Sequence, residues 1–245
     1  MTANAPAKQL AQMVLGARST VFFGGAGVST ESGIPDFRSA DGLYNRRYAL
    51  PAESILSHEY FVDETEAFYA FYRDQMIMPG ARPNAAHLTL ARWEQEGRLS
   101  AVITQNIDGL HQQAGSRTVW ELHGSVHRNR CMACGKAHGL EAITGSTGVP
   151  RCVCGGIIKP DVVLYGEGLD QHVIEGALDA IAGSDLLIIG GTSLTVYPAA
   201  GFVQGYRGKV VIINKTPTGM DRRADLLISA PIGQTLQQAA DVLEA

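Results

Sequence analysis

The 245-residue sequence lacks long apolar runs and a surplus of basic residues, and each absence excludes a class of protein. The longest apolar stretches, such as residues 186–189 and 210–213, are far shorter than the ~20 residues of a membrane-spanning helix. Twenty basic side chains stand against twenty-four acidic ones, so the net charge of −4 gives no general attraction to nucleic acid or anionic lipid. Residues 1–16 show no apolar stretch before a small-residue cleavage site, so we expect no secretory signal and a cytoplasmic location.

What the sequence does contain is typical of a folded globular protein. Hydrophobic residues make up 45% of the chain and charged residues 18%, which excludes disorder as the main state. At ~100–200 residues per domain, the length allows one large domain, alone or with an insertion. A chain of this length buries roughly 70–75% of its unfolded surface and needs no disulfide staples.

Short apolar runs alternate with helical patterns along the chain. The runs cover residues 20–24, 101–105, 119–123, 185–190, 209–214 and 225–229, and most do not alternate with polar residues. Such runs are typical of strands buried on both faces of a parallel sheet. Helical spacing occurs at Leu10 and Val14, at Ile174 and Ile181, and again from Leu236, while Asn84 is a candidate N-cap for a helix through Trp93. The alternation predicts an α/β fold with a doubly wound, parallel, Rossmann-like sheet.

Two stretches interrupt this alternation. Residues 36–78 contain an irregular loop and then an aromatic helix, and residues 124–160 contain the four cysteines with little periodicity. We predict that the first stretch forms a helical module and the second a ribbon module of one small inserted domain. The Rossmann-like large domain would then consist of residues 1–35, 79–123 and 161–245.

A glycine-rich turn follows the first predicted strand. Backbone N–H groups at a strand-to-helix turn can approach a pyrophosphate, and the helix dipole favours its negative charge. Gly25 and Gly27 fit the dinucleotide fingerprint G-x-G-x-x-G, but Thr30 stands where the third glycine belongs. Asn214 is the candidate for holding a ribose, since no acidic residue closes a nearby second strand. These departures argue against ordinary hydride transfer, and a turn without any ligand stays the alternative.

The cysteines favour a metal site. Cys131 and Cys134 form one pair and Cys152 and Cys154 another, with seventeen residues between the pairs. Clustered cysteines in a chain of this size favour a metal over a disulfide framework, and two pairs at this spacing are typical of a zinc ribbon. An all-thiolate site is closed, so one zinc ion would be structural. The second pair is C-x-C, one residue shorter than usual, which leaves His138 as a substitute ligand.

Five motifs occur in a recognisable order. They are GAGVSTESGIPDFR at residues 25–38, TQNIDGLH at 104–111, ELHG at 121–124, KPDVVLYGE at 159–167 and GTSL at 191–194. Together they resemble the sirtuins, the NAD-dependent protein lysine deacylases, in their compact bacterial or archaeal form. The resemblance runs from about Leu10 to the last helix. It implies that NAD is consumed to remove acetyl and other uncharged acyl groups from protein lysines, with nicotinamide, free lysine and O-acyl-ADP-ribose as products.

The resemblance also implies roles for individual residues. His123 would be the general base on a ribose hydroxyl, a role that suits an unperturbed pKa of ~6.5. His111 is the runner-up, for which we expect a structural hydrogen bond. Asp108 and the backbone of Ile107 would bind the nicotinamide carboxamide, and Phe37 would shield the reacting ribose carbon from water. The other expected NAD contacts are Ala26, Thr30, Arg38, Gln105, Asn106, Thr192, Ser193, Asn214 and Ile232.

The substrate peptide would bind, by the same resemblance, as an added strand between residues 163–167 and 194–197. The expected contacts are Val163, Gly166, Glu167, Leu194 and Val196. Phe37, Ile107 and Val163 would line an apolar tunnel for the acyl chain. Family members that prefer acidic acyl groups carry Tyr-x-x-Arg on the aromatic helix, whereas here Arg73 follows Tyr72 directly and Gln75 stands at the third place. We therefore expect uncharged acyl groups.

Three other functions remain as alternatives. The same site could transfer mono-ADP-ribose to proteins. A zinc-containing dehydrogenase is a second alternative, against which the missing third glycine and the His123 motif argue. A non-catalytic ribbon that binds nucleic acid is the third, since Arg128, Arg130 and Lys136 supply local positive charge. The acidic balance and the sparse aromatics disfavour that role, and we expect acyl-lysine proteins as partners, without nucleic acid or membrane.

Overall fold

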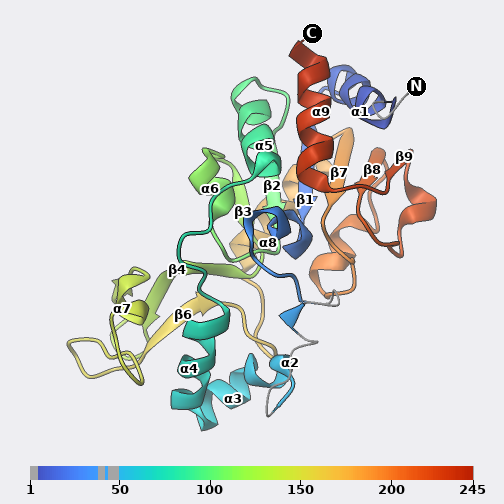
Figure 1. Cartoon of the computed structure of the whole chain (residues 1–245). Helices are drawn as coiled ribbons and strands as arrows, with labels where there is room; N and C mark the ends of the chain where they lie inside the picture. The colour runs from blue at the N-terminus through green and yellow to red at the C-terminus, as the bar shows by residue number, and fades with distance from the viewer. Residues whose placement is uncertain (1–4, 38–41, 44–49, 245) are drawn as a thin grey trace.

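A large parallel sheet and a small antiparallel sheet organise the computed structural model, which describes residues 5–37, 42–43 and 50–244 (Figure 1). The large sheet has six strands in the order β3-β2-β1-β7-β8-β9, all paired in parallel. Its strands are β1 (Thr20–Gly24), β2 (Ala101–Thr104), β3 (Val119–Glu121), β7 (Leu186–Gly190), β8 (Lys209–Ile213) and β9 (Leu226–Ile228). The six predicted strands are these six, so the predicted α/β fold with a doubly wound sheet is confirmed.

Helices cover both faces of the large sheet. Alternate residues of a strand point to opposite faces, so Phe22 packs with the helices of one side and Val21 and Phe23 with the other side. The first side is covered by α1 (Ala5–Gly16), α5 (Ala85–Gln95) and α9 (Ile232–Glu244), and the second by α8 (Gln171–Ala182) and the 3₁₀ helix η4 (Ala199–Val203). Burial on both faces explains why these strands read as continuous apolar runs.

The order of the strands places a crevice at the centre of the sheet. From β1 the chain continues through β2 and β3 on one side, whereas β7, β8 and β9 lie on the other side of β1. In open α/β sheets, ligands bind outside the carboxyl ends of the strands where the order reverses. The loops after β1, β2 and β7 therefore meet at the expected ligand site.

The predicted cap of α5 is confirmed. The Asn84 side chain accepts a hydrogen bond from the Ala86 N–H, and His87 Nδ1 accepts one from the Asn84 N–H, so the two residues form a capping box. The Asn84 amide nitrogen also donates to the Val28 carbonyl and to Ser32 Oγ. One residue thus starts the helix and ties it to the glycine-rich loop.

The small sheet has the order β5-β4-β6 and shares a core with the helices near it. Phe61, Phe68 and Tyr72 from one stretch of the chain pack with Ile143 and Ile158 from the other. The elements of this part are α2 (Ala52–Ile55), α3 (His58–Asp63), α4 (Thr65–Gln75), β4 (Gly124–Cys131), β5 (Ala137–His138), α7 (Glu141–Thr144) and β6 (Ile158–Val162). The short helix α6 (Leu110–Ala114) packs instead on α5 beside the large sheet. The domain boundaries drawn from the sequence stay predictions.

Among the helices of the described residues, none combines the length and the apolar character needed to cross a bilayer.

Candidate active site

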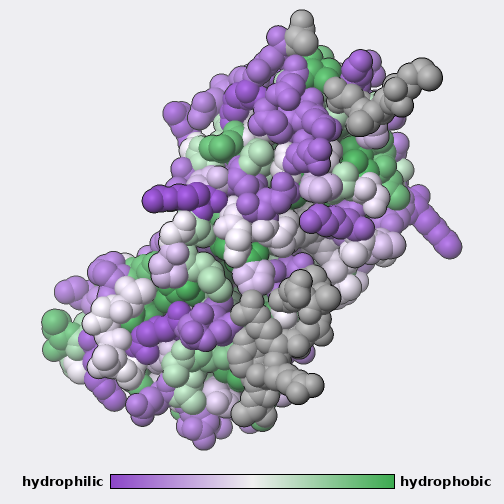
Figure 2. Space-filling view, in the orientation of Figure 1, coloured by the Kyte–Doolittle hydropathy of each residue, from purple (hydrophilic) through white to green (hydrophobic). Residues whose placement is uncertain are grey.

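The carboxyl ends of the central strands open into one large cavity of about 1430 Å³. Its walls come from both parts of the elongated molecule that Figure 2 shows from one face. The glycine-rich loop, residues 105–109, His123 and residues 191–193 line it from the large sheet, and Val126, Leu140 and residues 162–167 line it from the small sheet's side. Residues from distant segments of the chain thus meet around a space large enough for a dinucleotide and a side chain.

The glycine-rich loop packs directly against the loop after β7. The Gly27 N–H donates to the Gly191 carbonyl at 2.8 Å, and a Cβ on Gly27 would lie 2.8 Å from the Gly191 Cα. Thr30 Oγ1 donates to the Gly27 carbonyl at 3.0 Å, so the residue in the third glycine's place stabilises the turn. No α-helix follows within the described part of this segment; two short 3₁₀ turns, η1 (Ala26–Val28) and η2 (Thr30–Ser32), take its place. The prediction of a helix dipole directly behind the loop was therefore wrong: the backbone closes 3₁₀ turns, as in the bond from the Ser29 N–H to the Ala26 carbonyl, and Gly33, with a φ of 82°, ends them.

Three polar side chains form a connected network in the wall of the cavity. Asp108 accepts hydrogen bonds from Ser29 Oγ at 2.7 Å and from the Leu110 N–H at 2.9 Å. Asn106 Nδ2 donates to the same Ser29 oxygen at 3.0 Å. Ser29 is 1% exposed and was missed as a site residue by sequence reasoning, although it lies inside the glycine-rich motif. Its buried hydroxyl fixes the orientation of two side chains that line the cavity.

His123 lies just beyond β3 with one ring nitrogen committed to the backbone. Its Nδ1 lies 2.9 Å from the Gln105 carbonyl, and a carbonyl can only accept, so Nδ1 carries the hydrogen. In the neutral ring, Nε2 then keeps its lone pair. Burial lowers the pKa of His123, while the bond to Gln105 opposes that shift, so the ring is neutral near pH 7 and able to take a proton.

His111 does not make the hydrogen bond that we expected. Neither ring nitrogen has a partner among the described residues, and the ring lies 4.7 Å from that of His87, centroid to centroid. Burial lowers the pKa of both rings; the neighbouring His87 lowers the pKa of His111 further, whereas the Asp108 carboxylate opposes the shift at His87. His111 is therefore a neutral core residue, because its helix α6 packs on α5 and turns it away from the cavity.

The structure brings nearly all of the expected site residues to the cavity. Those that line it are Ala26, Thr30, Phe37, Gln105, Asn106, Ile107, Asp108, His123, Val163, Gly166, Glu167, Thr192, Ser193, Val196, Asn214 and Ile232. Leu194 instead lines a separate cavity of about 300 Å³, and it has a left-handed backbone with φ of 54°. Arg38 lies outside the described residues. Lys215 and Thr216 also line the large cavity and were not singled out from the sequence.

Two of the side chains near the cavity have partners within the protein. Gln105 Nε2 donates to Thr192 Oγ1 at 3.0 Å, which links the loops after β2 and β7. Asn214 Nδ2 donates to the Thr216 carbonyl at 2.7 Å, which leaves its amide oxygen for a ligand hydroxyl. Both contacts hold the loops in place around the carboxyl ends of the strands.

The expected peptide-binding segments both contribute to the cavity lining, and some of their groups are already engaged. The Val163 N–H donates to the His123 carbonyl at 3.0 Å, which joins this segment to the residue after β3. Glu167 receives Lys159 Nζ at 3.1 Å and the Leu164 N–H at 2.9 Å, and its other oxygen contacts His58 Nδ1 at 2.8 Å. Glu167 thus shapes the segment through internal bonds.

Arg73 is turned away from the cavity. Its guanidinium donates to the carbonyls of Tyr69, Ile143 and Gly148 and to Ser146 Oγ. Gln75, which is neutral, lines the cavity instead. The structure therefore offers no arginine from this helix to pair with an acidic acyl group, as the sequence predicted.

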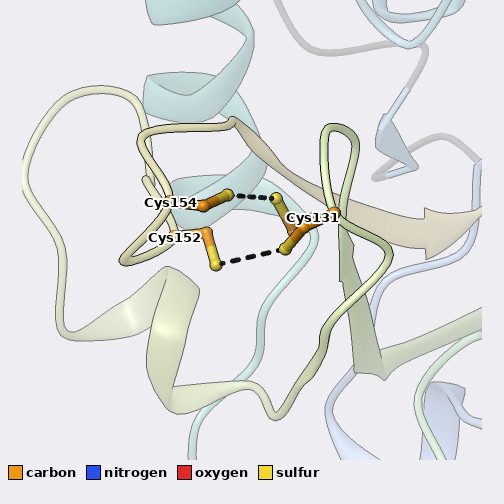
Figure 3. Close-up of side chains that lie close together, drawn as sticks. Cys131, Cys152 and Cys154 are labelled. Atoms are coloured by element: carbon orange, nitrogen blue, oxygen red, sulfur yellow. Dashed lines mark hydrogen bonds between the residues drawn. The ribbon is translucent and has the colours of Figure 1, made fainter.

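The four cysteines form the candidate metal centre (Figure 3). Their Sγ atoms lie within 4.8 Å of one another, with 3.4 Å between Cys131 and Cys154 and 3.8 Å between Cys134 and Cys152. Zn–S bonds of ~2.3 Å in a tetrahedron place sulfurs about 3.8 Å apart, whereas a disulfide requires ~2.05 Å. The residues fit one zinc ion, and in the part of the chain that the structure describes this group holds the four cysteines without His138.

Comparison with known proteins gives one consistent match. The Sir2 family model matches residues 25–198. An NAD-dependent protein deacetylase of Cutibacterium acnes is 57% identical over 94% of this chain and 95% of its own length. The enzyme of the same name from Clostridium acetobutylicum is 55% identical over 94% of this chain and 96% of its own length.

The solved structures that this chain resembles belong to the same family as these relatives. A complex of Sir2 with a p53 peptide and NAD+ has 37% identity and a TM-score of 0.85, covering 96% of this chain and 97% of that one. A histidine-to-alanine variant of Sir2 with deacetylated p53 peptide and 3′-O-acetyl ADP ribose gives a TM-score of 0.87 at the same identity and coverage. The chain is thus similar to proteins solved with both the co-substrate and a product.

Proposed function

Because this chain is a member of the Sir2 family, we propose that it is an NAD-dependent protein deacetylase. It removes acetyl groups from protein lysines and releases nicotinamide, deacylated lysine and O-acetyl-ADP-ribose. Its cofactors are NAD as co-substrate and one structural zinc ion. None of the relatives described above is named for ADP-ribosyl transfer to protein, hydride transfer or nucleic-acid binding.

The observation that carries this proposal is the state of His123. A neutral imidazole with its hydrogen fixed on Nδ1 presents a basic Nε2 at the edge of a dinucleotide-sized cavity. Bound NAD supplies the ribose that receives the acyl group as nicotinamide leaves. We assign to His123 the removal of a proton from a ribose hydroxyl, which makes that oxygen a nucleophile toward the acyl carbon.

The polar groups of residues 105–108 can hydrogen-bond the carboxamide of the departing nicotinamide. Asp108 keeps acceptor capacity beyond its bonds to Ser29 and Leu110, since an ionised carboxylate has about four lone-pair sites. It is therefore our candidate acceptor for the carboxamide N–H, with the backbone of Ile107 beside it. Asn106, which Ser29 orients, is proposed to hold the ribose.

The remaining lining residues are polar in one part of the cavity and apolar in another, and we propose a different role for each part. The turn at Ala26 and Thr30 and the loop at Thr192 and Ser193 are proposed to hold the diphosphate, where backbone N–H groups and hydroxyls meet. Asn214 and Ile232 are proposed to contact the adenosine half of NAD. Gln105 is proposed to hold the loops after β2 and β7 together around it through its bond to Thr192. Phe37, Ile107 and Val163 give apolar surface near His123, which suits exclusion of water from the reacting carbon and binding of an uncharged acyl chain.

The substrate peptide is proposed to add as a strand between residues 163–167 and 194–197. Gly166 and Val196 both line the cavity, and backbone contacts there would give affinity with little readout of peptide sequence. Leu194 faces the smaller cavity, so we propose that its role is to shape the segment. We place the enzyme in the cytoplasm, where its lysine substrates and reduced thiolates coexist.

Mass spectrometry of an acetyl-lysine peptide incubated with and without NAD tests the function. We expect loss of the acetyl group only with NAD, with nicotinamide and O-acetyl-ADP-ribose in equal amounts to the deacetylated peptide. NAD-derived mass attached to protein in place of soluble O-acetyl-ADP-ribose, or absorbance from a reduced nicotinamide, would contradict it. A succinyl-lysine peptide serves as the matched substrate, and we expect it to react more slowly because the Arg73 guanidinium is bonded to carbonyls away from the cavity and the neutral Gln75 lines it instead.

A further inference from the structure

His127 is an exposed side chain at the rim of the large cavity that the roles above do not use. It lies on β4, where the pairing with β6 shifts in register between Ser125 and Asn129. Such an irregularity re-aims side chains that a regular strand would direct elsewhere. Here the His127 N–H turns inward to Ser125 Oγ at 3.3 Å, and the imidazole reaches the loop after β2.

Two adjacent residues of β4 hold two adjacent carbonyls of that loop. The Val126 N–H donates to the Ile107 carbonyl at 3.0 Å, and His127 Nε2 lies 3.0 Å from the Asp108 carbonyl. A carbonyl only accepts, so Nε2 carries a hydrogen and donates it. The planar peptides before and after Asp108 are therefore both anchored, which fixes the direction in which its side chain leaves the backbone.

The contact between ring and loop is close. Gly109 has a φ of +71°, and a Cβ on it would lie 2.6 Å from the His127 Cδ2 atom. The glycine is thus required both by the backbone conformation and by the imidazole packed over it. The ring covers the point where the loop turns into α6.

We propose that His127 is a positioning residue that holds Asp108 for the nicotinamide carboxamide. It acts through the Asp108 backbone and does not touch the acyl-lysine substrate. The inference rests on the proposed function, since it takes Asp108 as the carboxamide-binding residue. It identifies a donor on the small sheet that sets the affinity of the site for nicotinamide and for NAD.

Steady-state kinetics of His127→Leu and His127→Gln test the proposal. Loss of one such bond changes an equilibrium by roughly five- to tenfold. For His127→Leu we expect the nicotinamide inhibition constant and the KM for NAD to rise by about that factor, with the KM for acetyl-peptide within twofold. Glutamine places an amide N–H near the position of Nε2, so His127→Gln is expected to restore both values to within about threefold.

The matched control is His172→Leu, an exposed histidine on α8 that lies outside the cavity walls. It is expected to leave all three constants unchanged. Unchanged nicotinamide inhibition and KM for NAD in His127→Leu would overturn the proposal, and so would a glutamine variant as impaired as the leucine variant. Failure of the unaltered protein to release nicotinamide with acetyl-peptide would instead overturn the proposed function.

Discussion

The imidazole of His123 has one nitrogen occupied by a backbone carbonyl and one left as a base. Replacing it by alanine removes the base and leaves the strands of the large sheet intact, because the residue lies beyond the end of β3. We expect His123→Ala to lower kcat by about 10²–10⁴-fold, the usual contribution of a positioned general base. The rate of deacetylation measures this, with His172→Ala as control, and near-normal turnover would remove the assignment.

Gly27 is needed for the approach of two loops. A methyl group there would lie 2.8 Å from backbone atoms of Gly191, which cannot rotate away as a side chain can. We expect Gly27→Ala to raise the KM for NAD by at least tenfold, since the loops after β1 and β7 are pushed apart. Gly16→Ala, at a position with open space around it, is the matched control. An unchanged KM in Gly27→Ala would contradict this account.

Some site residues could be predicted from the sequence and others could not. The spacing of the four cysteines already indicates a metal site, and the role of His123 follows from the resemblance of its motif to the sirtuins. Ser29 and His127 act through partners that lie 79 and 19 residues away, at Asp108. No local pattern records such a pairing, so these roles became visible only when the fold placed the loops together.

At the scale of elements, Asn84 joins a helix to the loop that faces the cavity. Asn84→Ala removes the cap of α5 and the two bonds to Val28 and Ser32. We expect the free energy of unfolding to fall by about 1 kcal/mol from the cap alone. Urea denaturation measures the loss, and Asn84→Ser, which keeps a capping oxygen, should recover part of it. Equal stability of the alanine variant and the unaltered protein would show that the cap contributes nothing.

The six strands of the large sheet were predictable because they are short apolar runs, and the inner strands β1, β2, β7 and β8 are buried on both faces. Their ends shifted by one or two residues, as at 119–123, where the strand stops at Glu121 and frees His123 for the cavity. The small antiparallel sheet was not predicted as strands, because β4 mixes buried and exposed residues and shifts its register. The short turns after β1 were taken for a helix start, since only the distant Gly191 reveals how tightly that chain must bend.

For the whole molecule, zinc should hold the small sheet together. Binding worth ~10–16 kcal/mol in small peptides indicates how strongly such sites favour the folded state. We expect complete removal of the metal by a chelator to lower the melting temperature and to expose the core around Phe61 and Ile158. Calorimetry with metal analysis tests this, and re-addition of zinc should reverse the change. An unchanged melting temperature in verified metal-free protein would refute the structural role.

Acid should destabilise the fold through its buried imidazoles. Burial lowers the pKa of His87 and His111 below the ~6.5 of the unfolded chain, so the unfolded state binds more protons in acid. Their contribution to stability is complete above pH ~6.5 and is lost as the pH falls toward the folded pKa values. Urea midpoints at pH 7.5 and 5.5 measure the slope. His111→Leu should flatten it, and an equally steep slope in that variant would contradict the cause given.

The short segment 105–108 contributes to two different steps of the proposed reaction. The carbonyl of Gln105 orients the imidazole of His123, and three residues later stands Asp108, the proposed acceptor for the departing amide. A compound that displaces residues 105–108 would therefore disturb proton removal and amide release together. A single inhibitor bound beside the end of β2 should block both steps.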